Sequence, residues 1–335
     1  MSDRTAGIGE PAATEEKAAN RKGPGFSRLF RTYGTLTIFI LLVLLASTQS
    51  DAFLTERNAT NLLRQMSGVG IMAIGMLFVI LTRGIDLSVG SIAALGAVTS
   101  AMFVQDMSMP MAVASVVLIG AACGAVSGFL IAFLRLPAFV ITLAMMTGAR
   151  GLALILSNGQ PVMPGTSGQG LQNFGTSFTL GLPNPAWLML SLFAIAFLIL
   201  NFSRFGRLVK AIGSNEEAVR LSGISVPWYV ASVYVISGAL AAVAGLLVTA
   251  RSGVGSAQVG VAAELDVIAA VVIGGASLMG GRGDVVNTFI GVMILGVIGN
   301  IMNLAGVPGY HQQVYLGVII VVAVVLQNSA QLFRR

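Results

Sequence analysis

The sequence has few of the residues on which metal sites, disulfides and nucleotide-binding loops depend. Its 335 residues include one cysteine, Cys123, and one histidine, His311. A single cysteine cannot form an internal disulfide, and this pair is too small for a Cys/His zinc site. None of the three lysines follows glycine, so the Walker A sequence ending in Gly-Lys-Ser/Thr is absent. We therefore expect no metal, no cofactor and no catalytic site, and any ATP and Mg²⁺ to be bound by a partner subunit.

Charge is also scarce. Charged residues make up 10% of the chain and hydrophobic residues 56%, and the mean hydropathy is +0.88. A soluble domain has about 25% charged residues, so this composition excludes a water-soluble globule and indicates a membrane protein. The positive excess lies beside apolar segments. It is therefore attributed to orientation in a lipid bilayer and not to nucleic-acid binding.

Long apolar segments recur along the whole chain. A spanning helix needs about 20 mostly apolar residues, and its backbone polar groups must be bonded within the helix. The sequence therefore predicts an all-α integral membrane protein with about ten transmembrane helices. The predicted ranges are 34–50, 66–82, 87–104, 111–133, 137–156, 186–202, 228–250, 265–280, 287–305 and 312–330, of which the third and the eighth are the weakest because each is rich in glycine and adjoins a charge.

The distribution of Lys and Arg predicts the orientation. With both termini in the cytoplasm, fifteen positive residues lie inside and three outside, in agreement with the positive-inside rule. Residues 1–31 are expected to form a disordered cytoplasmic tail, and residues 32–332 a single transmembrane domain. In this topology the uncharged segment 157–185, with four prolines and six glycines, is an outer loop. The segment 203–227 is the one substantial cytoplasmic loop.

The cytoplasmic loop contains helix-capping signals. Ser214 followed by Glu217 fits a capping box, and Gly223 fits the end of a helix. A helix this short is only marginally stable in isolation, so we expect it to pack on another surface. Two interpretations stay open, a loop lying on its own membrane domain and a docking element for a cytoplasmic partner.

A second motif places two charges between apolar segments. In residues 82–91, Asp86 could accept hydrogen bonds from the amides that open the next helix, and Arg83 could cap the carbonyls that close the previous one. Because charges inside a membrane are costly, these residues serve either as caps or in a transport pathway. Polarity within apolar segments suggests the following pathway candidates: Asp86, Ser88, Ser91, Thr142, Asn300 and Asn303.

Glycines form a third pattern. Gly120, Gly124 and Gly128 recur at the four-residue spacing that lets two helices approach closely, and we favour a neighbour within the same chain. Gly274 and Gly275 begin a glycine-rich stretch that ends near residue 284. This stretch predicts either tight helix packing or a broken helix that exposes backbone groups.

Three stretches together resemble the permease subunits of ribose-type, monosaccharide ABC importers, the inner-membrane components of binding-protein-dependent transport. They are Gly84-Ile-Asp-Leu-Ser-Val-Gly90, the loop 211–224, and Val272-Ile-Gly-Gly-Ala-Ser-Leu-Met-Gly-Gly281. Many members have Gly-Gly-Thr-Ser where this chain has Gly-Gly-Ala-Ser at 274–277. The resemblance covers residues 60–328.

This resemblance implies a type II importer fold related to the vitamin B12 permease, with two permease copies around one pathway in a bacterial inner membrane. It also implies a cytoplasmic ATPase with two nucleotide-binding modules and a periplasmic or extracellular sugar-binding protein. The loop helix then looks like a coupling helix that contacts the ATPase. Its candidate residues are Gly213, Ser214, Asn215, Glu216, Glu217, Ala218, Arg220, Leu221 and Gly223.

The expected function is therefore ATP-driven import of a ribose-, xylose- or galactose-like sugar by alternating access. The chain itself would not be an enzyme. The alternative is an ion-coupled secondary transporter, which would place ionisable groups near the middle of the membrane, where we find chiefly Arg150.

Overall fold

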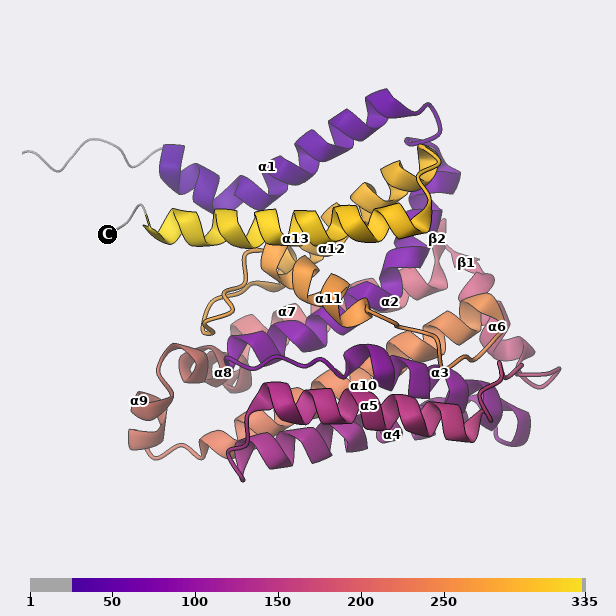
Figure 1. Ribbon diagram of the computed structural model, residues 1–335, viewed down its shortest axis with the longest axis horizontal. Helices are drawn as coiled ribbons and strands as arrows, with labels where there is room; N and C mark the ends of the chain where they lie inside the picture. The colour runs from indigo at the N-terminus through magenta and orange to yellow at the C-terminus, as the bar shows by residue number, and fades with distance from the viewer. Residues whose placement is uncertain (1–25, 333–335) are drawn as a thin grey trace, which may run out of the picture.

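The computed structural model describes residues 26–332 as a bundle of helices (Figure 1). Of the predicted tail, residues 1–25 lie outside this range, and residues 26–31 belong to the first helix. The long helices are α1 (Phe26–Gln49), α2 (Glu56–Leu81), α3 (Val89–Asp106), α4 (Met109–Ala132), α5 (Ala138–Leu156), α7 (Asn184–Phe202), α10 (Val226–Ser252), α12 (Val285–Leu304) and α13 (Gly309–Leu332).

Seven of these helices are long and apolar enough to cross a membrane, namely α2, α3, α4, α5, α7, α10 and α12. The predicted ranges 34–50 and 312–330 coincide with α1 and α13. The expected continuous span over 265–280 is absent, because α11 (Ala263–Ile273) has only 11 residues and is capped by Gly274. The next residue, Gly275, has φ +84°, a left-handed conformation that takes the chain out of the helix.

Helix α10 is the centre of the bundle and packs against α2, α3 and α4. The contact with α4 is very close because of its three regularly spaced glycines. A Cβ atom added to Gly120, Gly124 or Gly128 would lie 2.4, 2.1 and 2.6 Å from the nearest α10 atom. The small-residue stripe therefore meets a helix of the same chain. Gly274 fits as closely against α12, with 2.6 Å between an added Cβ and the carbonyl oxygen of Asn287.

The remaining elements gather at the two ends of the bundle. The segment 203–227 contains two short helices, α8 (Arg204–Ser214) and α9 (Glu216–Leu221). The segment 157–185 contains α6 (Gln169–Thr176) and a small antiparallel hairpin of β1 (Phe178–Thr179) and β2 (Leu182–Pro183). Figure 1 shows these two groups at opposite ends, with α8 and α9 on the side where α1 begins and α13 ends.

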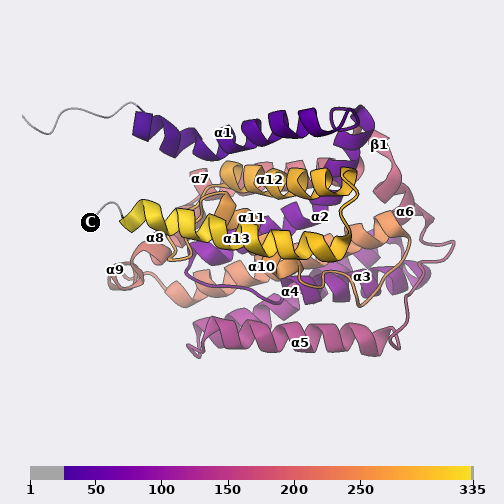
Figure 2. The same cartoon turned by 45° about the horizontal axis from the view of Figure 1, so that its top comes forward.

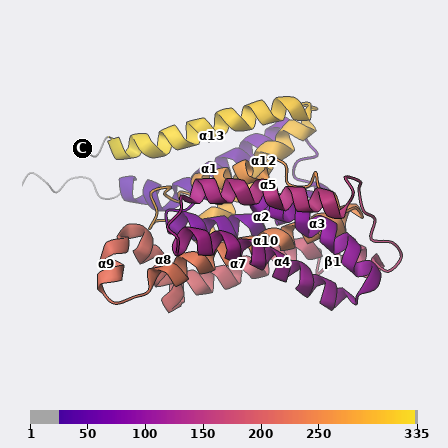
Figure 3. The same cartoon turned by 60° about the horizontal axis from the view of Figure 1, so that its bottom comes forward.

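The edges of the bundle are strongly apolar. Helices α1 and α5 lie at opposite edges (Figure 2), and α13 runs along an outer edge (Figure 3). Helix α5 has only three buried residues, Thr142, Ala149 and Ala153. Large exposed side chains such as Phe139 and Ile155 cover the rest of it, as expected for a surface in contact with lipid.

Two connections within the bundle are irregular, 82–88 between α2 and α3, and 253–262 between α10 and α11. Asp86 in the first contacts Ser237, the twelfth of the 27 residues of α10, so this connection enters the bundle. The second connection meets the first at the start of α3, where a Cβ added to Gly90 would lie 2.2 Å from the carbonyl oxygen of Gly260. Irregular backbone at this depth must be bonded by protein groups, because lipid supplies none.

Candidate functional site

The segment predicted as one capped helix is a pair of helices with different caps. Ser203 caps α8, since its Oγ accepts a hydrogen bond from the Gly206 amide at 3.1 Å. Asn215 caps α9, since its Oδ1 accepts one from the Ala218 amide at 3.0 Å. The predicted capping box of Ser214 and Glu217 is therefore wrong. Ser214 is the last residue of α8, and its hydroxyl donates to the Lys210 carbonyl at 2.9 Å.

Helix α9 ends as predicted at a glycine. Gly223 has φ +81°, and its amide donates to the Arg220 carbonyl at 3.0 Å. Arg220 in turn donates to Glu217 Oε1 at 2.7 Å, and this carboxylate raises the pKa of the exposed guanidinium. The pair stiffens a helix of only six residues.

The apolar residues of α9 divide between two sides. Val219 packs in a small core with Ile212 and Val226, which joins α9 to α8 and to the start of α10. Leu221 is 77% exposed, and Ala218, Glu216 and Glu217 are also exposed. The segment is therefore attached to the membrane domain by one side and presents a mixed apolar and acidic surface on the other. Trp228, 67% exposed in the first turn of α10, packs instead against the Phe133 ring at the end of α4, with 5.0 Å between ring centres.

The end of α8 is locked to the end of α2. Arg83 donates from Nε to the Gly213 carbonyl at 2.8 Å and from Nη2 to the Ser214 carbonyl at 2.9 Å. Arg83 therefore caps α8, and not the helix that precedes it in sequence. A Cβ on Gly213 would lie 1.7 Å from the Leu81 carbonyl oxygen, so only glycine permits this contact.

The glycine-rich turn after α11 joins the same place. The amide of Gly281 donates to the Leu81 carbonyl at 2.9 Å. A Cβ on Gly280 would lie 2.4 Å from the side chain of Arg83. Three segments far apart in the chain thus meet at one junction, which we call the inner junction (Leu81–Arg83, Gly213–Ser214 and Gly280–Gly281). Two of them belong to the stretches that carry the family resemblance, and Leu81–Arg83 directly precedes the third.

Asp86 continues this connection into the bundle. Its Oδ1 accepts hydrogen bonds from the amide and hydroxyl of Ser88, at 3.0 and 2.6 Å, and its Oδ2 accepts one from Ser237 of α10 at 2.7 Å. Asp86 is only 1% exposed. The carboxylate therefore accepts a hydrogen bond from the Ser88 amide, at the start of the next helix as the sequence predicts, and also anchors the loop 82–88 to the central helix.

The other pathway candidates are also bonded within the bundle. Ser91 accepts from Arg150, and Thr142 donates to the Ala138 carbonyl at 2.9 Å. Asn300 exchanges two hydrogen bonds with Asn58, joining α12 to α2, whereas Asn303 accepts from Gln312 of α13 at 2.9 Å. Among the described residues, no group of His, Cys, Asp or Glu side chains could hold a metal ion.

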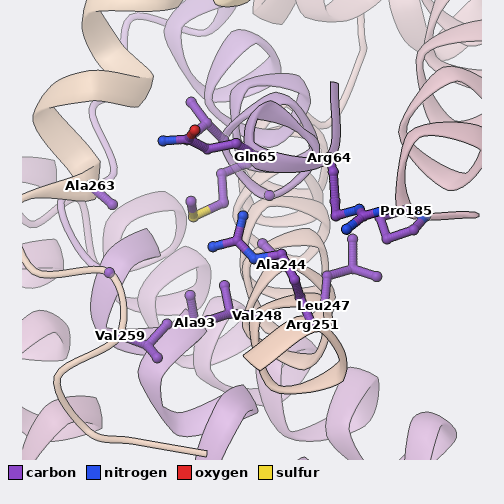
Figure 4. A pocket seen from close by; sticks show the side chains of 14 residues that line it. Arg64, Gln65, Ala93, Pro185, Ala244, Leu247, Val248, Arg251, Val259 and Ala263 are labelled. Atoms are coloured by element: carbon purple, nitrogen blue, oxygen red, sulfur yellow. The ribbon is translucent and has the colours of Figure 1, made fainter. Parts of the chain in front are cut away.

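A cavity of about 170 Å³ lies toward the other end of the bundle, between α2, α3, α10 and the start of α11 (Figure 4). Arg64, Gln65 and Arg251 are its polar side chains, and the other lining residues are apolar or glycine. None of the six pathway candidates lines it. We call it the outer cavity.

The two arginines of the outer cavity are not ion-paired within the described part of the chain. Arg64 lies over the Phe178 ring, 4.9 Å from its centre, while its buried Nε has no hydrogen-bond partner there. Nothing in the sequence distinguished these two arginines from ordinary outer charges, because their proximity depends on the packing of α2 against α10.

Comparison with known proteins assigns the family. Residues 58–324 match the family described as branched-chain amino acid transport system / permease component. The ribose import permease protein of Escherichia coli K12 is 44% identical over 300 residues, 89% of this chain and 94% of that protein. The ribose import permease protein of Bacillus subtilis is 41% identical over 317 residues, 94% and 98% of the two chains.

An L-arabinose transport system permease protein of Escherichia coli K12 is 36% identical over 324 residues, 96% of this chain and 98% of that protein. No solved structure matches the chain. The family match covers the inner junction, the outer cavity, six of the seven spanning helices in full and α2 from its third residue onward. The chain therefore belongs to this permease family and is a multi-pass membrane protein similar to bacterial sugar ABC importer permeases.

Proposed function

We propose that this protein is the membrane subunit of an ATP-driven importer that carries a ribose-, xylose- or galactose-like sugar inward by alternating access. Its relatives are named for ribose and L-arabinose, which supports a monosaccharide cargo. The chain has no Walker A sequence, so the energy must come from a separate ATPase. That ATPase carries two nucleotide-binding modules and their ATP and Mg²⁺.

The observation that carries this proposal is the inner junction. A movement of the α8–α9 segment would act directly on the end of α2 and on the glycine-rich turn between α11 and α12, because Arg83, Gly213 and Gly281 bond these elements to one another. Asp86 extends the connection to α10. A contact on the exposed side of α9 would therefore be transmitted to helices that border the outer cavity.

The proposal includes the topology and the partners. Ten segments cross the membrane in the type II arrangement, and both termini lie in the cytoplasm. In this topology α8 and α9 lie inside the cell and the segment 157–185 lies outside. The ATPase docks on the exposed side of α9, and a sugar-binding protein delivers cargo to the outer end. A second copy of the permease completes the transporter. No feature of the described residues favours the ion-coupled alternative over this one.

The test is reconstitution with the partners. Proteoliposomes containing the permease and its ATPase, supplied with the binding protein and radiolabelled ribose or L-arabinose, should accumulate one sugar only when ATP is present on the ATPase side. Scrambling residues 213–225 should abolish this uptake. Normal uptake by the scrambled protein, or uptake driven by a sodium or proton gradient without ATP, would contradict the proposal.

A further inference from the structure

Arg150 is the one charged residue in the middle of α5, the helix with the fewest buried side chains among the spanning helices. Its guanidinium nevertheless points into the bundle. Nη1 donates to the carbonyl oxygens of Ala257 and Val259, the latter at 3.3 Å, and Nη2 donates to Gly260 at 3.4 Å. One cation thus donates to three backbone carbonyls of the irregular connection 253–262, of which the Gly260 carbonyl also accepts from the Ala263 amide at 3.2 Å.

The same guanidinium also contacts the other irregular connection. Nε donates to Ser91 Oγ at 3.3 Å, in the first turn of α3. Gly90, its neighbour, packs directly on Gly260, and the carboxylate of Glu264 lies beside both glycine and guanidinium. Arg150 therefore lies where the two interrupted parts of the bundle cross.

Carbonyls at a helix interruption are strong cation ligands. In membrane transporters, unwound backbone and nearby acids form the sites that hold a coupling ion. In this chain the position next to those carbonyls is filled by a guanidinium that cannot leave and cannot lose its charge. Val259 and Gly260, whose carbonyls it holds, also line the outer cavity.

We propose that Arg150 is a positioning residue, a tethered cation that takes the place of a mobile ion and holds segment 257–260 as a wall of the outer cavity. It acts by fixing backbone, not by contacting cargo. The same bonds hold α5, which has few buried contacts of its own, against the rest of the bundle. This inference rests on the proposed transport function, and it predicts that transport needs no coupling ion because the carbonyl site is filled.

The experiment is chemical rescue in proteoliposomes that contain the permease and its ATPase, supplied with the binding protein. Because Arg150→Ala removes four hydrogen bonds from one charged group, uptake should fall at least about tenfold. Guanidinium ion at millimolar concentration should restore much of it, since it can reoccupy the vacated site, whereas sodium or potassium should not. Arg150→Lys should retain intermediate activity, because an ammonium group cannot reach all four acceptors.

A second readout reports on the wall itself. In a Cys123→Ser background, Gln258→Cys places a thiol on the exposed side of the segment. Its labelling by a membrane-impermeant reagent should accelerate in Arg150→Ala and slow again with guanidinium. If the alanine variant does not fold, the labelling rate of Gln258→Cys can be measured in Arg150→Lys instead.

The matched control is Arg135→Ala, which removes an exposed arginine just before α5 that donates no hydrogen bond among the described residues. Its activity should not depend on guanidinium. Unchanged uptake in Arg150→Ala, rescue by sodium, or the absence of guanidinium rescue in a folded variant would overturn the inference. If the unmodified protein shows no ATP-driven uptake in the same vesicles, the proposed function fails instead.

Discussion

The arginine of the inner junction and the two that line the outer cavity differ in how their guanidinium groups are bonded. At the inner junction, the Arg83 guanidinium donates hydrogen bonds to two carbonyls of α8, with N–O distances of 2.8 and 2.9 Å. At the outer cavity, Arg64 and Arg251 have no ion-pair partner within the described residues, and the Nε of Arg64 is buried without an acceptor. The inner junction is therefore bonded as a rigid connection, whereas the outer cavity keeps a buried guanidinium donor that has no acceptor among the described residues.

The strongest test of this comparison is a substitution at the closest contact of the inner junction. Gly213→Val would put a Cβ 1.7 Å from the Leu81 carbonyl oxygen, where neither backbone can move without breaking the junction. We expect a cost above about 4 kcal/mol and loss of sugar uptake. Thermal unfolding in detergent and uptake in proteoliposomes would measure this.

The control for that substitution is Gly148→Val in α5, where an added Cβ has nothing within 4 Å. It should fold and transport normally. If Gly213→Val behaved like this control, the inner junction would not be a tight contact.

Arg83→Met is expected to have the next largest effect. It keeps the bulk of the side chain but leaves the carbonyls of Gly213 and Ser214 without their charged donor, a loss of about 1.5 to 3 kcal/mol per bond. Sugar transported per ATP hydrolysed should fall at least about tenfold, the factor that corresponds to about 1.4 kcal/mol, while ATPase activity persists. Arg204→Met, at an exposed arginine without a hydrogen bond from its side chain among the described residues, should leave this ratio unchanged.

Glu217→Gln should impair the coupling of ATP hydrolysis to sugar uptake while leaving the stability of the folded protein nearly unchanged. The pair with Arg220 is more than half exposed on both sides, so its loss should change the free energy of unfolding by less than about 1 kcal/mol. Because Glu217 lies on the side of α9 proposed to meet the ATPase, uptake should nevertheless fall several-fold. A fall in melting temperature that accounts for the lost uptake would argue for a purely structural role.

The smallest effect is expected at the outer cavity. Arg64→Met removes a guanidinium that has no ion pair within residues 26–332, and the lost contact with Phe178 is worth only about 0.5 to 1 kcal/mol. The melting temperature should therefore change far less than in Arg83→Met. Equal destabilisation by the two substitutions would remove the contrast between the ends of the bundle.

The elements that depend on local sequence could be predicted. Apolar length located the seven spanning helices, and the glycine at 223 located the end of α9, because both signals act within a few residues. The start of α9 was misplaced by one residue. Ser214 and Asn215 can both cap a helix, but α8 continues through Ser214, and only Asn215 has the extended backbone that a cap requires, with φ −158° and ψ 94°.

Contacts between distant segments could not be predicted. Arg83 and Gly213 are 130 positions apart, and no local pattern indicates that one bonds the other. The sequence shows Arg150 as a charge within a predicted span, yet its carbonyl acceptors belong to the connection 253–262, which lies between two of the predicted spans. The contact of this connection with Gly90 at the start of α3 likewise joins segments about 170 positions apart, and no local pattern indicates it.

The most direct test of the central claim asks which side of the membrane α9 faces and what covers it. With Ala218→Cys in a Cys123→Ser background, an impermeant maleimide should label the thiol in inside-out vesicles and not in intact cells. Bound ATPase should block that labelling. Labelling from outside intact cells, or labelling in inside-out vesicles that is indifferent to the ATPase, would contradict the account.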